Sequence, residues 1–353
     1  RGLLIWTACC LTALGLNVAQ LAGWLTAGSV YAAPELPLIL ALGTLSTVIL
    51  GFESTKRFTA DRRIEQKRVV LIELASMLIG TVISIILAWH MRSVWALIIG
   101  GWVATVSSVV AGHSWLHGHS NRLAWDRGFA LQIFGFGKWI LASSLLYVLA
   151  INGDKLLLGV WVAPAVLGCY AIAQNLAQVL EMAVGRVFSQ VAAPAFADLI
   201  GHSPHRLREV YLRMRLPFDL LFIAAAGFMF GVGPWLIDVM YDPRYAQAGT
   251  LLQILSFLLI FARYGVSTSA YLALQAPHAQ AVMNLVRIVA FIVAVPTAYK
   301  VFGVQGAYWA IALHPVAIAP VVWWFDRRFG IGSWRHEVFR LAAWPAGYAA
   351  GYA

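Results

Sequence analysis

The sequence predicts an all-α membrane protein that crosses the bilayer about ten times. Of its 353 residues, 61% are apolar and only 11% are charged, whereas soluble domains carry about 25% charged residues. The mean hydropathy of +0.77 agrees with this composition. A soluble domain of this size needs a polar exterior, which these residues cannot supply, so most of the exterior has to face lipid.

The apolar residues fall into stretches of about 20, the length that a helix needs to cross the hydrocarbon core. No stretch shows the period-two alternation of a half-buried β-strand, so helices are expected throughout. Ten stretches are complete, at residues 3–26, 36–53, 69–90, 94–116, 132–152, 164–190, 216–237, 249–271, 279–299 and 304–325. An eleventh begins near residue 338, and Arg1 adjoins the first, so we expect a fragment truncated at both ends.

The basic residues, which give a net charge of +10, cluster in short loops between the apolar stretches. These loops are 54–68, 117–130, 200–215 and the segment after residue 325. They alternate with loops poor in Lys and Arg, and the positive-inside rule therefore places them in the cytoplasm. Basic residues distributed in this way do not form the continuous surface that binds nucleic acid, so no nucleic acid partner is expected.

Metal, cofactor and catalytic sites are not indicated by the sequence. Cys9, Cys10 and Cys169 lie in apolar stretches without metal-ligand spacing. His113 and His117 have the i,i+4 spacing of a metal pair, but no nearby carboxylate or thiol completes a set. The loops are too short to hold the extramembrane domain of a membrane enzyme. We therefore expect no catalytic residue, no bound metal and no cofactor.

A weak internal repeat relates residues 73–97 to residues 286–310. Each copy is an apolar helix followed by a short basic turn and then the start of another helix. The offset between the copies is six helices, an even number, so the two would have the same orientation. This pattern predicts two lobes related by an axis along the membrane normal, as in transporters with parallel repeats.

Several short motifs follow one another with a characteristic spacing. They are Phe134-Gly135-Phe136-Gly137, Asp154 to Gly159, Leu167 to Ala173, Ala193-Pro194-Ala195, Tyr241 to Ala246, and Phe302 to Ala307. In content and spacing they resemble the oligosaccharide flippases of the polysaccharide transporter group, within the multidrug/oligosaccharidyl-lipid/polysaccharide exporter superfamily. These are packing and turn motifs, so they point to the fold more strongly than to the substrate.

The resemblance implies a two-lobe flippase-type helix bundle in the bacterial inner membrane, with the first two family helices missing. Residues 1–116 would be the remaining four helices of the N-terminal lobe, and residues 117–130 a cytoplasmic linker. Residues 131–325 would form the six-helix C-terminal lobe. Residues 326–353 would be a cytoplasmic loop and the start of a further helix.

Polar and charged side chains within the apolar stretches are the candidates for a transport site. An ionisable group at the centre of a membrane helix costs about 2.5–3.5 kcal/mol and usually faces the bundle interior or a wet cavity. Arg287 lies near the middle of residues 279–299, with Asn284 on the same face, and Arg263 lies within residues 249–271. The remaining candidates follow residue 164 and are Gln174, Asn175, Gln178, Glu181 and Arg186.

Two interpretations of these residues remain open. In the first, Arg287, Arg263 and Arg186 attract a pyrophosphate, because a guanidinium binds phosphate oxygens bidentately and stays charged at any working pH. The amides of Asn175, Asn284, Gln174 and Gln178 would then bind sugar hydroxyls. In the second, Glu181 neutralises Arg186 or Arg263, and the charges only hold the bundle together.

Glu181 and Asp154 are the candidates for coupling transport to a proton or sodium ion, because a carboxylate in a wet cavity can change its protonation. Glu181 lies nearer the middle of the membrane. Asp154 is expected at the outer interface beside Lys155, where plain solvation is the alternative to a coupling role.

The resemblance and the basic helices together favour a transporter that flips a polyprenyl-pyrophosphate-linked oligosaccharide to the outer leaflet by alternating access. Such a protein would serve lipopolysaccharide or exopolysaccharide export beside membrane lipids, a polysaccharide polymerase and assembly proteins. The closest alternative is a drug/cation antiporter of the same superfamily, although a cationic substrate favours an acidic cavity. A membrane polysaccharide polymerase or glycosyltransferase is the alternative from the enzyme class.

Overall fold

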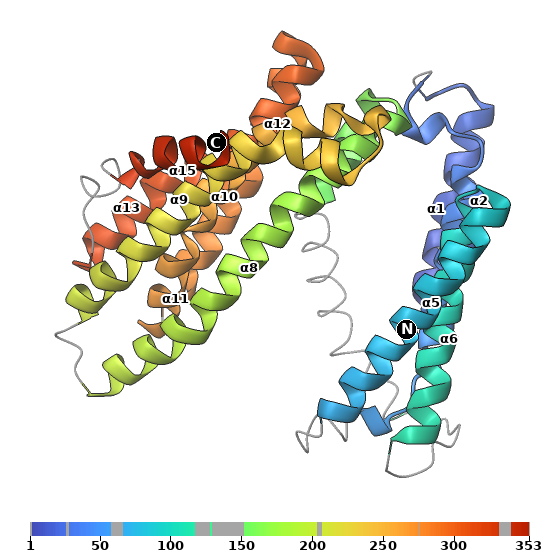
Figure 1. Cartoon of the computed structure of the whole chain (residues 1–353), viewed down its shortest axis with the longest axis horizontal. Coiled ribbons are helices and arrows are strands. Elements are labelled where there is room, and N and C mark those ends of the chain that lie inside the picture. Colours follow the sequence, from blue (N-terminus) through green and yellow to red (C-terminus); the bar gives the residue numbers. More distant parts are fainter. Residues whose placement is uncertain are drawn as a thin grey trace. The chain divides into compact units, whose positions relative to one another are not determined.

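The computed structural model describes residues 2–25, 28–57, 66–116, 128, 152–202, 207–274, 276–331 and 340–352, and the regular secondary structure in these ranges is helical (Figure 1). The prediction of an all-α protein without strands is confirmed for these residues. The chain divides into two compact units, Arg1–Val148 and Leu149–Ala353. The predicted lobe boundaries and the cytoplasmic linker stay predictions, because most of residues 117–151 lie outside the described ranges.

The first unit is built from short helices packed beside one long helical pair. Its elements are α1 (Gly2–Leu21), η1 (Val30–Ala32), α2 (Leu36–Gly43), α3 (Leu45–Leu50), α5 (Gln66–Met91) and α6 (Trp95–Trp115). Two indole N–H groups join these helices, because Trp6 donates to the carbonyl of Ala41 and Trp102 donates to that of Leu42, at 2.9 and 3.1 Å. Each bond satisfies a buried polar group inside an otherwise apolar contact.

The long pair, α5 and α6, packs through glycine. A Cβ placed on Gly100 would lie 2.8 Å from the carbonyl oxygen of Gly80, and one placed on Gly80 would lie 2.8 Å from that of Gly100. Small residues allow two membrane helices to approach until their backbones are in contact. The neighbouring Gly101 faces open space, so the close approach is confined to one face of α6.

The second unit holds the longer helices and the larger core. A helix over residues 152–161 precedes α8 (Pro164–His202), α9 (Leu207–Met240), η3 (Pro243–Tyr245), α10 (Gln247–Ala262), α11 (Gly265–Ala273), α12 (Pro277–Leu313), η4 (His314–Ala317), α13 (Ile318–Arg328) and α15 (Ala343–Tyr352). Tyr170, Ile223 and Leu252 are fully buried where α8, α9 and α10 meet. The core therefore lies between long helices that also expose many apolar side chains, as lipid-facing helices do.

The prediction of ten membrane spans is confirmed in part. Five described helical stretches are long and apolar enough to cross a membrane: Lys67–Met91, Trp95–Trp115, Tyr211–Met240, Gln247–Tyr271 and His278–Arg328. The predicted spans 3–26 and 36–53 contain the shorter apolar helices Ile5–Leu21 and Leu36–Leu50. The span predicted at 132–152 lies outside the described ranges. The helix α8 covers the span predicted at 164–190, but its Gln, Asn and Glu side chains interrupt the apolar surface.

The longest of these stretches, of 51 residues, contains two of the predicted spans. Gly303 interrupts α12 with φ 64° and ψ −154°, a backbone conformation that L-residues with a Cβ rarely adopt. Gly306 then packs against the carbonyl of Ala298, eight residues earlier in the chain, which a continuous helix does not allow. The chain therefore turns back at Gly303, and the boundary predicted between 279–299 and 304–325 agrees with this break.

The last helix, α15, packs along α9 through a second glycine interface (Figure 1). Gly347 lies against the backbone of Ala224, and Gly351 lies against that of Phe228. The contact advances by four residues on both helices, so the two run in the same direction. The start of the eleventh helix predicted near residue 338 is thus a packed part of the second unit.

Replacing glycine at residues 100 and 101 should separate packing from helix propensity. We expect Gly100→Ala to lower the unfolding free energy by about 1–3 kcal/mol, because the added methyl group meets a backbone that cannot move away. Gly101→Ala, one position along the same helix, should leave stability unchanged or raise it by up to about 1 kcal/mol. Thermal unfolding of both variants in detergent micelles checks this, and equal melting temperatures would contradict the packing assignment.

Candidate functional site

An exposed polar group lies on α8 and α12. Glu181 and Arg287 both have exposed side chains, and Arg287 lies within electrostatic range of the Glu181 carboxylate and of the half-buried His314 ring. Glu181 is about 25 Å along α8 from its first residue, and Arg287 is about 15 Å along α12 from its first residue, at 1.5 Å per residue. This group joins two helices that are far apart in the sequence.

The amide side chains predicted for the site do not all lie on one surface. Asn284 and Asn175 are exposed, Gln178 is half-buried, and Gln174 is 6% exposed. The polar stripe of α8 therefore runs from the core at Gln174 to the surface at Glu181. Arg186 lies in α8, but its side chain is outside the described part of the structure, so a pairing of Glu181 with Arg186 stays a prediction.

Arg263 lies apart from Arg287, inside the second unit. It follows α10 and is only 4% exposed. Its guanidinium stacks over the ring of Tyr264, 5.1 Å from the centroid, and acts electrostatically on Asp219. The carboxylate within its range is thus on α9, whereas the basic partner of Glu181 is Arg287. The structure does not bring Arg263 and Arg287 together on one surface.

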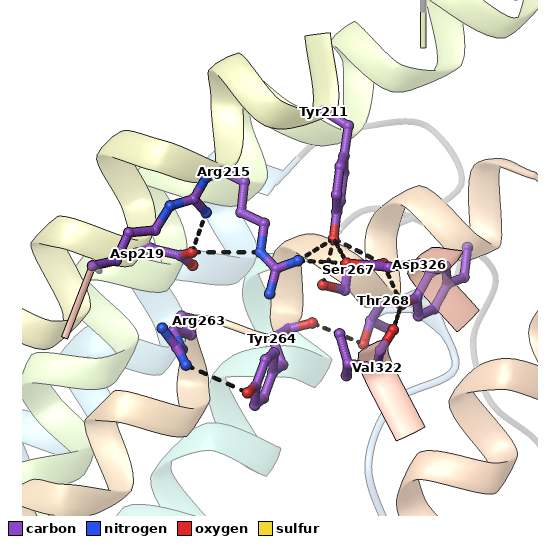
Figure 2. A network of polar contacts seen from close by, with 11 residues as sticks. Tyr211, Arg215, Asp219, Arg263, Tyr264, Ser267, Thr268, Val322 and Asp326 are labelled. Atoms are coloured by element: carbon purple, nitrogen blue, oxygen red, sulfur yellow. Dashed lines mark hydrogen bonds and ion pairs between the residues drawn. The ribbon is translucent and has the colours of Figure 1, made fainter. Parts of the chain in front are cut away.

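Arg263 borders a buried network of charged and polar side chains (Figure 2). Asp326 on α13 accepts hydrogen bonds from Arg215 Nη1 at 2.6 Å and from Tyr211 Oη at 2.9 Å. Asp219 on α9 accepts one from Arg340 Nη1 at 2.5 Å, and Arg215 Nε lies 3.4 Å from the same carboxylate. Arg215 therefore links the two aspartates.

Hydroxyl groups complete this network. The Tyr271 Oη donates to Asp326 at 2.6 Å, and the hydroxyls of Tyr211 and Ser267 are hydrogen-bonded at 2.8 Å. The four ionised side chains, those of Arg215, Asp219, Asp326 and Arg340, are each at most 8% exposed. Buried charges of this kind are stable only when they are paired and hydrogen-bonded, and this is how the structure holds them.

The sequence interpretation missed this network. It assigned Arg215 to a cytoplasmic loop at residues 200–215 and did not consider Asp219, Asp326 or Arg340. That loop assignment is wrong for its last residues, because α9 already begins at Leu207. The one local signal was Asp219, an acidic residue in an apolar stretch, placed four residues after Arg215 on the same helix face.

Asp154 forms a third polar group, on the helix over residues 152–161. Its side chain is 7% exposed, and it accepts hydrogen bonds from Tyr170 Oη and, at 2.6 Å, from Gln174 Nε2. Solvation at the outer interface is therefore wrong for Asp154, because α8 encloses the carboxylate with two donors one turn apart. Lys155 Nζ lies 3.4 Å from Asn152 Oδ1 instead.

Two further polar atoms are buried on elements that border Asp154. Gln174 Oε1 and Tyr308 Oη have no hydrogen-bond partner among the described residues, and the rings of Tyr308 and Tyr170 stack at 6.2 Å. Asp154 Oδ2 accepts both hydrogen bonds from α8, and the backbone N–H of Lys155 donates to Oδ1 at 2.8 Å. Within the described ranges, no three His, Cys, Asp or Glu side chains gather as a metal ion would require.

Comparison with known proteins places the chain in a family. A family model described as "Polysaccharide biosynthesis protein" matches residues 4–248. The amylovoran biosynthesis protein AmsL of Erwinia amylovora is 25% identical over 233 residues, which is 64% of this chain and 58% of AmsL. The chain thus spans less than two thirds of the length of that relative. No solved structure matches the chain significantly.

The family match extends over several of the polar residues and long apolar helices described above. The family model covers the first unit and the second unit as far as the start of α10, so it includes α8, α9 and three of the five long apolar stretches found in the described residues. The resemblance inferred from the short motifs is confirmed at the level of the family. The chain belongs to the polysaccharide biosynthesis protein family.

Proposed function

We propose that this protein is a flippase that moves a polyprenyl-pyrophosphate-linked oligosaccharide from the cytoplasmic to the outer leaflet. The lipid tail would stay in the bilayer while the sugar-pyrophosphate head crosses through a polar cavity. Two lobes that open alternately to each side would carry out the exchange. Membership of a polysaccharide biosynthesis family supports a saccharide substrate, and the long apolar helices support a role within the membrane.

The exposed charge of Arg287 is the observation that carries this proposal. Among the described residues no ion pair within 4 Å holds its guanidinium, although it lies on an apolar helix at membrane depth. A guanidinium facing lipid there would cost several kcal/mol, so a water-filled cavity explains its exposure best. The guanidinium can then bind two phosphate oxygens at once, which a lysine cannot do with the same geometry.

The neighbours of Arg287 fit an oligosaccharide head. Asn284 lies one turn earlier on α12, and Asn175 and Gln178 lie on α8 near Glu181, so amide donors and acceptors flank the basic group. Sugar hydroxyls both donate and accept hydrogen bonds, and amides match them in both roles. Arg263 and Gln174 are buried, so their contact with the substrate would require the cavity to open further.

An electric potential would assist this direction of transport. The interior of a bacterial cell is negative, and moving one negative charge outward gains about 2.3 kcal/mol for each 100 mV. Coupling to a proton or a sodium ion would add to this, and Glu181 and Asp154 are our candidates. Asp154 suits the role because it is buried and accepts hydrogen bonds from the uncharged side chains of Tyr170 and Gln174.

Arg287→Ala should abolish most of the exchange. The test uses the protein in proteoliposomes with a fluorescent polyprenyl-pyrophosphate oligosaccharide and an impermeant quencher that reports the leaflet. We expect a loss of about tenfold or more in initial rate, with partial activity in Arg287→Lys, which keeps the charge but not the bidentate geometry. Arg244→Ala is the matched control, since Arg244 is 74% exposed in the loop around η3.

Three results would overturn this assignment. Full activity in well-folded Arg287→Ala would remove the arginine from the site. Equal losses in Arg287→Ala and Arg244→Ala would indicate a general effect of charge. No exchange by folded wild-type protein under a potential or an ion gradient would favour a drug/cation antiporter, which efflux of a fluorescent organic cation would then detect.

Asp154→Asn should uncouple transport without unfolding the protein. Asparagine keeps the shape of the side chain but can neither bind a proton at working pH nor neutralise a cation, so the response of the exchange rate to a pH or sodium gradient should disappear. Exchange driven only by the substrate gradient should persist. The matched control is Asp238→Asn, on the exposed outer part of α9. An unchanged gradient response in Asp154→Asn would exclude this residue from coupling.

A further inference from the structure

The buried network joins four parts of the second unit that are far apart in the chain. Tyr211, Arg215 and Asp219 come from α9, Arg263 to Tyr271 from the junction of α10 and α11, Asp326 from α13, and Arg340 from the residues before α15 (Figure 2). The two aspartates are 111 and 121 residues in sequence from their arginine partners, Arg215 and Arg340. The network therefore fixes the tertiary arrangement of these helices.

Separating these helices would expose unpaired charges inside the protein. The side chains of Arg215, Asp219 and Asp326 are at most 3% exposed, so water cannot replace a lost partner unless the helices move apart. Breaking a buried pair by removing one member is strongly destabilising, because the other charge stays buried without compensation. A buried ion pair of this kind is therefore suited to stay formed throughout a transport cycle.

The contact of α9 with α15 adds a second constraint on the same block. Gly227 approaches the backbone of Trp344 and Gly347, and Gly231 approaches that of Tyr348 and Gly351. Close backbone contacts of this kind leave no space for one helix to slide past the other. The ion pair of Arg340 with Asp219 lies at the start of this interface and fixes its register.

The helices α8 and α12 differ from this block. The network contacts described above come from α9, the α10–α11 junction, α13 and Arg340, whereas α8 and α12 pack against these elements through apolar side chains such as Ala173 and Met283. Both carry the exposed polar residues of the candidate site, Glu181 on α8 and Arg287 on α12. α12 also contains Pro296 and the break at Gly303, and both features allow a membrane helix to bend.

We propose that the network is a permanent lock that joins α9, the α10–α11 pair, α13 with the adjoining η4, and α15 into one rigid block. As the two lobes open alternately, α8 and the first part of α12 then move against this block. The second half of this inference rests on the proposed function, whereas the rigidity of the block does not. The lock assigns Arg340 and Asp219 a structural role in positioning α15, distinct from the substrate-facing role of Arg287.

Two cysteine pairs with similar separation test the lock. Phe230 and Tyr348 join α9 to α15, with ring centroids 5.8 Å apart, and Phe291 and His314 join the first part of α12 to η4, at 5.3 Å. Each pair of residues is replaced by cysteines in a chain in which Cys9, Cys10 and Cys169 are replaced by alanine. A cleavable thiol cross-linker should leave exchange within about twofold for the first pair and reduce it about tenfold, reversibly, for the second.

Spin labels on the same cysteine pairs give a readout that needs no transport. The lock predicts one narrow distance distribution for the α9–α15 pair and two populations for the α12–η4 pair. Arg340→Gln should broaden the first distribution, whereas Arg244→Gln, which breaks the exposed pair with Asp242, should not. The substitution at residue 340 keeps a long polar side chain, so a folded variant is expected.

The outcomes separate the lock from the proposed function. A broad α9–α15 distribution in the unmodified protein, or a narrow one that survives in Arg340→Gln, would overturn the lock whatever the protein transports. Exchange that persists with α12 cross-linked to η4 would overturn the assignment of motion to α12. Absence of exchange in every sample, with the spin-label contrast intact, would leave the lock standing and remove only the flippase assignment.

Discussion

Arg215 reaches two carboxylates from different parts of the chain, Asp219 one turn further along α9 and Asp326 on α13. Neither aspartate can be buried alone, because a carboxylate in an apolar interior loses far more hydration than packing returns. Arg340 donates a hydrogen bond to Asp219, and the hydroxyls of Tyr211 and Tyr271 donate to Asp326. The placement of α9, α11, α13 and the approach to α15 follows from satisfying these two side chains.

The polar residues of the second unit differ in how far neighbouring side chains supply the partners that a buried charge requires. Where an opposite charge and several donors enclose the group, as at Asp326, the result is a fixed contact between helices. Asp154 is buried among uncharged hydrogen-bond donors. Arg287 is not enclosed and lies on a surface. Enclosure, rather than residue type, separates the structural charges from those available to a ligand.

Much of the fold could be predicted because hydrophobic length is a local property. The stretches 69–90, 94–116, 216–237 and 249–271 each match a long apolar helix, and the boundary near residue 303 matches the turn at Gly303. The ends of the helices were less predictable. α9 begins nine residues before the predicted start at 216, because Arg213 and Arg215 continue the helix instead of forming a loop. A basic residue is compatible with either conformation.

The site could be predicted less well because burial depends on partners far away in the sequence. Arg263 and Arg287 look alike as single basic residues in apolar helices, yet one is buried against Tyr264 and the other is exposed. Asp154 was expected near water, and only the position of Tyr170 and Gln174 on α8 encloses it. Periodicity finds the face of a helix but does not identify the helix that will cover it.

The position of Arg340 also has a consequence for biosynthesis. Asp219 and Arg340 are 121 residues apart in sequence, so at the usual rate of roughly 5–20 residues per second the ribosome completes the partner about 6–24 s after the aspartate. During that interval, the basic side chains that can act on Asp219 are Arg215, on its own helix, and then Arg263. The second unit thus reaches its final helix arrangement late, and until then its unfinished interface is open to the membrane insertion and quality-control machinery of the cell.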